Sequence, residues 1–159
     1  MAILFLPGYR VGWIAPGKFK DAVIRQKNIH LISTPVLNQE AIANFMENDR
    51  YENHLRKLRH ELHSNSLHFI QAITNYFPDE TKFITPQGGF MLWVELDKRI
   101  NATELYYTAL RQKISIAPGR MFTLQDQYKN CMRLSYGQRW TPFMEERLML
   151  LGKIIKELL

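Results

Sequence analysis

The sequence predicts an α+β fold in which a small sheet carries helices against one face. From residue 82 onward the segments alternate as strand, strand, helix, strand, strand, helix, an order that builds a single layered domain. The 159 residues are enough for one good core and too few for two. A hydrophobic content of 46% and a charged content of 23% are typical of a globular domain.

Residues 6–17 contain two Pro-Gly turns with a predicted strand between them. Proline presets φ and glycine accepts a left-handed φ, so each pair favours a sharp bend. Val11 to Ile14 favours an extended backbone between the bends. Arg10 places a fixed charge beside the first turn, where a guanidinium suits a phosphate or a carboxylate. An ordinary surface arginine on a strand explains the same pattern.

Three helices are predicted before the sheet. Residues 18–32 mix charged and apolar side chains at helical spacing. Thr34 as N-cap and Pro35 in the first turn precede an apolar stripe over residues 36–46. The longest helix is expected from about residue 50 to 77, where apolar side chains recur at threes and fours. Such a helix is roughly 40 Å long, and we expect it to join two lobes.

The C-terminal part is expected to hold four strands and two helices. Asn101 and Glu104 form a capping-box pattern that begins a helix through residue 113. Thr141 and Pro142 begin the last helix. The strands are expected at residues 82–84, 90–96, 114–117 and 130–136.

Charge and cysteine content narrow the function classes. The net charge of +6 is compatible with nucleic acid, an acidic ligand or an acidic partner segment, and by itself decides nothing. The single cysteine, Cys131, excludes an internal disulfide and fits a reducing cytoplasm. It lies in an alternating apolar segment, where a buried inert thiol is usual. No apolar run is long enough to cross a bilayer, so no membrane partner is expected.

The histidines and basic residues of the long helix invite two further interpretations. His60 and His63 are three residues apart, which is not the i, i+4 pairing of a zinc-binding helix, and no metal is expected. Arg56, Lys57 and Arg59 are expected to form a solvated basic face. Because no helix-turn-helix pattern accompanies them, we expect no direct nucleic-acid contact by this segment.

Four motifs resemble a known family. The run Pro-Gly-Tyr-Arg-Val-Gly-Trp at residues 7–13 resembles the segment after the Schiff-base lysine of fold-type I pyridoxal-phosphate enzymes. It is most similar to the aminotransferase-like domain of MocR-type regulators in the GntR superfamily. Residues 87–94, 116–119 and 131–135 resemble strands of the small C-terminal domain of that fold. The resemblance implies a small, mostly antiparallel sheet over residues 49–159, with its connecting helix, and a remnant of the large domain in residues 1–48.

The resemblance also assigns roles to individual residues. Arg10 falls on the arginine that holds the cofactor phosphate, and Arg133 on the arginine that grips the α-carboxylate of the substrate. The Schiff-base lysine falls on Ile3, so the chain has no catalytic residue of that kind. Pyridoxal 5′-phosphate is therefore expected in the full-length parent, with no covalent attachment here. The chain is expected to be inactive alone as an aminotransferase.

Two functions from different classes follow from the resemblance. The first is the effector-sensing C-terminal part of a pyridoxal-phosphate-binding MocR-type transcriptional regulator, with a winged helix-turn-helix and the large domain as partners. The second is the C-terminal part of an aminotransferase acting on an amino acid. A truncated product that only folds or dimerises is a third, and the identity of the amino compound is left open. Because the strand of residues 9–14 lacks neighbours, we also expect a homo-oligomer through residues 1–48.

Overall fold

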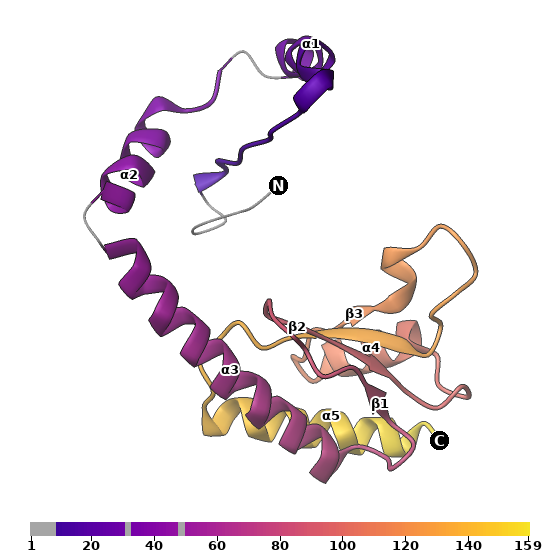
Figure 1. Cartoon of the computed structure of the whole chain (residues 1–159). Coiled ribbons are helices and arrows are strands. Elements are labelled where there is room, and N and C mark those ends of the chain that lie inside the picture. Colours follow the sequence, from indigo (N-terminus) through magenta and orange to yellow (C-terminus); the bar gives the residue numbers. More distant parts are fainter. Residues whose placement is uncertain (1–8, 31–32, 48–49) are drawn as a thin grey trace. The chain divides into compact units, whose positions relative to one another are not determined.

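The computed structural model describes residues 9–30, 33–47 and 50–159 (Figure 1). The chain divides into two compact units, residues 1–56 and 57–159, and each is considered by itself. The predicted domain boundary between residues 48 and 49 stays a prediction. The described part of the chain contains no helix that is both long and apolar enough to span a membrane.

In the described part of the first unit, helices α1 (Lys20–His30) and α2 (Val36–Glu47) contribute no buried residues to a core. A short 3₁₀ turn, η2 (Gly17–Phe19), leads into α1, and α2 follows. These helices confirm the two that the sequence predicts, yet neither contains a buried residue. The long helix α3 (Arg50–Tyr76) begins in this unit and confirms the third prediction.

The prediction of a strand between the two Pro-Gly turns is wrong. Residues 10–16 have no regular secondary structure, and Trp13 and Ile14 are 60% and 64% exposed. A strand needs a neighbour to accept and donate its backbone hydrogen bonds, and no described segment pairs with this one. The second turn does form as predicted, since Gly17 has a left-handed φ of 52°.

The second unit contains the predicted antiparallel sheet. Its strands are β1 (Lys82–Phe83), β2 (Met91–Glu95), β3 (Ala117–Pro118) and β4 (Cys131–Ser135), in the order β1-β2-β4-β3 with every pair antiparallel. The third strand, predicted at residues 114–117, begins three residues later and covers only Ala117 and Pro118. Pro118 has no N–H to extend the ladder, and the chain turns at once into η3 (Gly119–Phe122).

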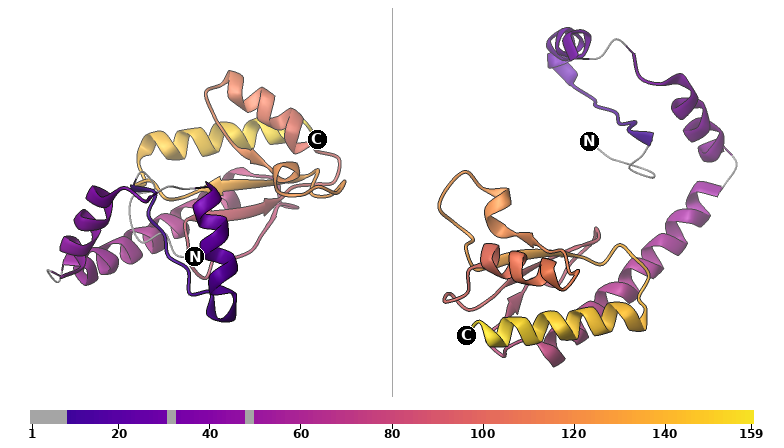
Figure 2. Two further views of the ribbon diagram at one scale, coloured as in Figure 1. Left: turned by 90° about the horizontal axis from the view of Figure 1, so that it is seen from above. Right: turned by 180° about the vertical axis from the view of Figure 1, so that it is seen from behind.

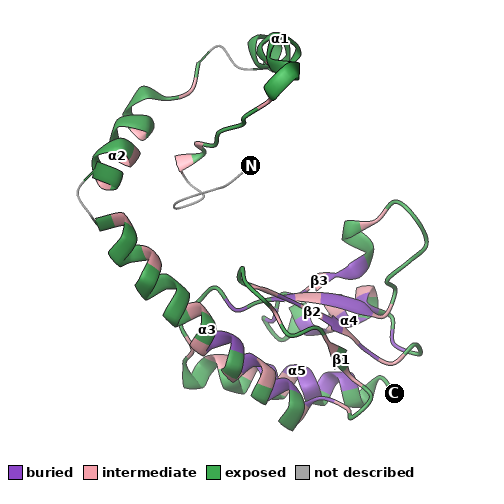
Figure 3. Ribbon diagram, in the orientation of Figure 1, coloured by how far each residue is buried: buried purple, intermediate pink, exposed green. Residues whose placement is uncertain are grey.

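The helices cover one face of this sheet. Along β2 buried and half-buried residues alternate, as the period of two of a strand requires, and in β4 the half-buried Arg133 lies between the buried Met132 and Leu134. The buried set joins a core cluster with α3, α4 (Ala102–Arg111) and α5 (Pro142–Glu157), and Figure 3 shows the burial concentrated there. From the sheet and these helices the cluster includes Leu92, Val94, Met132, Leu134, Phe69, Ile73, Leu105, Leu151 and Ile155.

Side-chain caps and one buried amide fix the helices around the sheet. Asn101 accepts a hydrogen bond from the Thr103 amide at 3.0 Å, which confirms the predicted start of α4. Thr141 likewise caps α5. In α3 the buried Asn65 amide donates to the carbonyls of Tyr136 and Gln138 and accepts from the Trp140 amide. In Figures 1 and 2 α5 lies alongside the C-terminal half of α3.

Candidate carboxylate-binding site

Arg133 is the charged residue in the middle of β4. Its chain neighbours Met132 and Leu134 point into the core, so strand alternation places Arg133 on the sheet face opposite to the helices. In the ladder it lies directly across from Trp93 of β2. The residue is half-buried, which keeps its charged head within reach of solvent or a ligand.

Trp93, Phe122 and Tyr128 form an aromatic cluster, here called the aromatic platform, and its Phe122 contacts Arg133. The guanidinium carbon lies 4.1 Å from the ring centroid of Phe122, a cation–π contact. Trp93 packs edge-on against Phe122, with centroids 6.0 Å apart, and against Tyr128, with centroids 5.3 Å apart. Stacking uses the face of a guanidinium and leaves its in-plane N–H donors available. Among the described residues none forms a hydrogen bond or ion pair with the Arg133 side chain. The planar fork of N–H donors on its guanidinium is therefore open to an anionic ligand.

The loop from Gly119 to Tyr128 builds the platform and is held by local contacts. A Cβ on Gly119 would lie 2.6 Å from the Tyr128 carbonyl oxygen, so glycine is required for this close approach. Asp126 forms ion pairs with Arg120 at 3.0 Å and Lys129 at 2.7 Å. The hydrogen bond from Lys129 lowers the pKa of the Asp126 carboxyl below its usual value.

The sequence predicts Arg133 as a candidate ligand but does not predict the aromatic platform beside it. Phe122 and Tyr128 belong to a connection between strands, where no periodicity marks a buried or stacked aromatic residue. The available signal was the Pro-Gly pair at residues 118 and 119, followed by two aromatic residues before the next strand. Such a loop after a strand end is a common position for binding residues.

Arg10 lies in the first unit, and the two arginines are therefore not placed relative to each other. Its side chain is exposed, and its φ of 52° is in the left-handed region that non-glycine residues rarely adopt. The carbonyl of the preceding residue, Tyr9, accepts a hydrogen bond of 2.8 Å from the side chain of Asn38 in α2. Its role as a phosphate ligand stays a prediction. Ile3, at the lysine position, lies outside the described residues.

The residues present fit only part of a pyridoxal-phosphate site. An exposed guanidinium at Arg10 suits a phosphate group. An isoleucine at position 3 cannot form the covalent link that a lysine provides, so this donor set does not fit a covalently held cofactor. Among the described residues, no group of three His, Cys, Asp or Glu side chains is placed to hold a metal ion. Cys131 is buried, and burial raises the pKa of its thiol.

Solved structures define the class of protein to which this fold belongs. The α-aminoadipate aminotransferase LysN of Thermus thermophilus, complexed with N-(5′-phosphopyridoxyl)-L-leucine, is 27% identical with a TM-score of 0.84. The likeness covers 96% of this chain and 39% of that one. The kynurenine aminotransferase of Pyrococcus horikoshii is 25% identical, with a TM-score of 0.83 over 95% of this chain and 38% of its own. The fold is thus that of part of a fold-type I aminotransferase domain.

Sequence comparison gives the family. Residues 4–141 match the family Aminotransferase class I and II, and the chain belongs to it. The HTH-type transcriptional regulator YdcR of Escherichia coli is 35% identical over 96% of this chain, and YjiR of the same organism is 31% identical over 94%. The 2-aminoadipate transaminase of Thermus thermophilus is 27% identical over 96%. This chain spans only 32% of each regulator and 38% of the transaminase.

Proposed function

We propose that this chain is the effector-sensing C-terminal part of a pyridoxal-phosphate-binding regulator of the MocR type. Arg133 binds the carboxylate of a small amino compound with its open fork, and the aromatic platform orients the guanidinium. Arg10 contacts the phosphate of the cofactor in the parent protein. The parent regulator is cytoplasmic and binds DNA through its winged helix-turn-helix. This chain does not catalyse transamination by itself.

The main support for the proposal is that this chain has a higher sequence identity to regulators than to an aminotransferase. Two HTH-type regulators match at 35% and 31%, whereas the aminotransferase reaches 27% over a similar share of the chain. A guanidinium that binds a carboxylate suits a sensor as well as an enzyme, because binding an amino acid requires no bond to be broken. The missing lysine at position 3 favours sensing within this chain.

A catalytic parent is the second candidate function. The TM-score of 0.84 with an aminoadipate aminotransferase supports it, as does the position of Arg133 on a strand of the small domain. In this case Arg133 binds the α-carboxylate of an amino acid substrate.

The experiment that separates the two begins with the reading frame upstream of codon 1. A regulator requires a winged helix-turn-helix there, and the purified parent should then retard a DNA fragment from its own promoter in a gel-shift assay. Addition of the effector should change the apparent affinity for that DNA, and Arg133→Lys should abolish this response while leaving DNA binding intact. An upstream frame that encodes only the large domain, with transaminase activity of the product, contradicts the regulator.

A further inference from the structure

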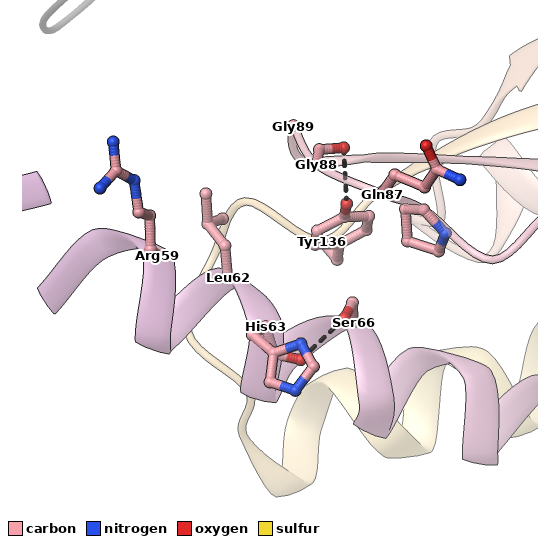
Figure 4. A pocket seen from close by; sticks show the side chains of 9 residues that line it. Arg59, Leu62, His63, Ser66, Gln87, Gly88, Gly89 and Tyr136 are labelled. Carbon is pink, nitrogen blue, oxygen red and sulfur yellow. Dashed lines mark hydrogen bonds between the residues drawn. The ribbon is translucent and has the colours of Figure 1, made fainter. Parts of the chain in front are cut away.

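A small pocket opens between the long helix and the loop before β2, wholly within the unit of residues 57–159. Figure 4 shows it between Arg59, Leu62, His63 and Ser66 of α3, the Gly88–Gly89 turn, and Tyr136. Its volume of about 210 Å³ is less than the roughly 300 Å³ at which drug-sized sites begin. The space therefore suits one small chemical group.

The polar lining of this pocket offers donors and no carboxylate. Arg59 and His63 are four residues apart on α3, which places them on one side of the helix. Across the described chain, the Arg59 side chain has no hydrogen bond or ion pair, and no Asp or Glu lines the pocket. A guanidinium without a partner beside a concave surface is a receptor for an oxyanion.

The turn of Gly88 and Gly89 adds backbone donors. Gly89 has a φ of 78°, and a Cβ at either glycine would meet nothing within 4 Å, so the space beside this backbone is open. The hydroxyl of Tyr136 donates to the Gly88 carbonyl at 3.4 Å and anchors the turn from below. Neither glycine amide donates to another backbone group in the part of the chain that is described. Exposed amides at a left-handed turn are a known anion-binding arrangement.

This pocket is separate from the carboxylate-binding site. Tyr136 continues the alternation of Met132 and Leu134 and packs its ring 6.3 Å from that of Phe69, so it lies on the helix-covered face of the sheet. Arg133 lies on the other face. We propose that the pocket of Arg59, His63, Gly88 and Gly89 is a second binding site, which takes a small oxyanion, a phosphate or a carboxylate.

Backbone amide NMR of the full 159-residue chain tests this site. We would titrate inorganic phosphate in one arm and acetate in another, at pH 7 and at constant ionic strength set with sodium chloride. At least one anion should shift the Gly88 and Gly89 amide resonances along a saturating curve, and the arm that saturates identifies the oxyanion. Arg59→Gln should weaken binding at least about five-fold, because it removes the charged fork and leaves the exposed helix surface intact.

The matched control is Arg111→Gln, which removes the same charge from an exposed position at the end of α4. It should leave the dissociation constant within about two-fold, since the solvent screens a distant charge. His63→Gln is a second pocket variant, and it should weaken binding with an unchanged spectrum elsewhere. Shifts that rise linearly with both anions overturn the proposal. Equal weakening by Arg59→Gln and Arg111→Gln also overturns it, because binding would then reflect net charge alone.

Discussion

Arg133 shows how a strand with a buried face can carry a fixed charge. Its neighbours in sequence enter the core, and the platform on the other face accepts the guanidinium through Phe122 at 4.1 Å. Such a contact at a partly exposed site contributes about 0.5–1 kcal/mol. It orients the side chain more than it stabilises the fold, which is the property that a binding residue needs.

Asn65 is the buried polar residue on which the joint between β4 and α5 depends. Its side-chain NH₂ donates hydrogen bonds to the carbonyls of Tyr136 and Gln138, and its side-chain oxygen accepts one from the Trp140 amide. Asn65→Ala leaves these groups without partners, and we expect the free energy of unfolding to fall by about 2–4 kcal/mol. Urea denaturation measures this loss. Gln71→Ala, at an exposed position of the same helix, should change it by less than about 0.5 kcal/mol, and an equal loss in both variants would refute the assignment.

Cys131 is expected to be chemically silent in the folded protein. Its side chain is buried, and burial raises the pKa of the thiol, so the reactive thiolate is scarce at pH 8. Reaction with a disulfide reagent such as DTNB should be at least about ten-fold slower in the native chain than in the chain unfolded by urea. A native rate equal to that of the unfolded chain would show that the thiol is accessible.

At the scale of elements, α5 packs against the end of α3 through a glycine. A Cβ at Gly152 would lie 2.5 Å from the Tyr76 carbonyl oxygen, so no side chain fits there. Gly→Ala within a helix ordinarily stabilises by about 1 kcal/mol. Here we expect Gly152→Ala to lower the melting temperature and to cost about 1–3 kcal/mol, because two helices must separate. Gly88→Ala, where a Cβ meets nothing, is the control for stability, and a stabilised Gly152→Ala would contradict this packing.

The helices could be predicted from sequence because their signals are local. The caps at Asn101 and Thr141 and the apolar spacing of α3 depend on residues within a few positions of one another. The extended segment from residue 10 to 16 could not, because a strand exists only where a second segment pairs with it. Arg133 could be proposed as a ligand from its motif alone, whereas the stacking of Phe122 depends on a loop that folds back over the sheet.

At the scale of the whole molecule, the two units differ in how well they are stabilised. The cluster of buried residues lies in residues 57–159, and α1 and α2 bury none of theirs. Large apolar side chains stay exposed in the first unit, such as Ile29 at 73% and Leu37 at 83%. Exposed apolar surface of this kind tends to recruit a second chain.

We therefore predict that the isolated chain self-associates through its first 48 residues. Sedimentation velocity at tens of micromolar should show dimers or larger species that dissociate on dilution. Truncation to residues 49–159 retains the sheet and its helices and should sediment as a folded monomer. A compact monomer of the intact chain at the same concentration would refute this prediction.

The claim that Arg133 binds a carboxylate is tested most directly by calorimetric titration with N-(5′-phosphopyridoxyl)-L-leucine, the compound bound in the related LysN structure. Arg133→Lys keeps the positive charge but loses the planar fork, and we predict at least about ten-fold weaker binding. Arg111→Lys, at an exposed position on α4, should bind as the unsubstituted chain does. Equal affinities for all three proteins would contradict the assignment of Arg133.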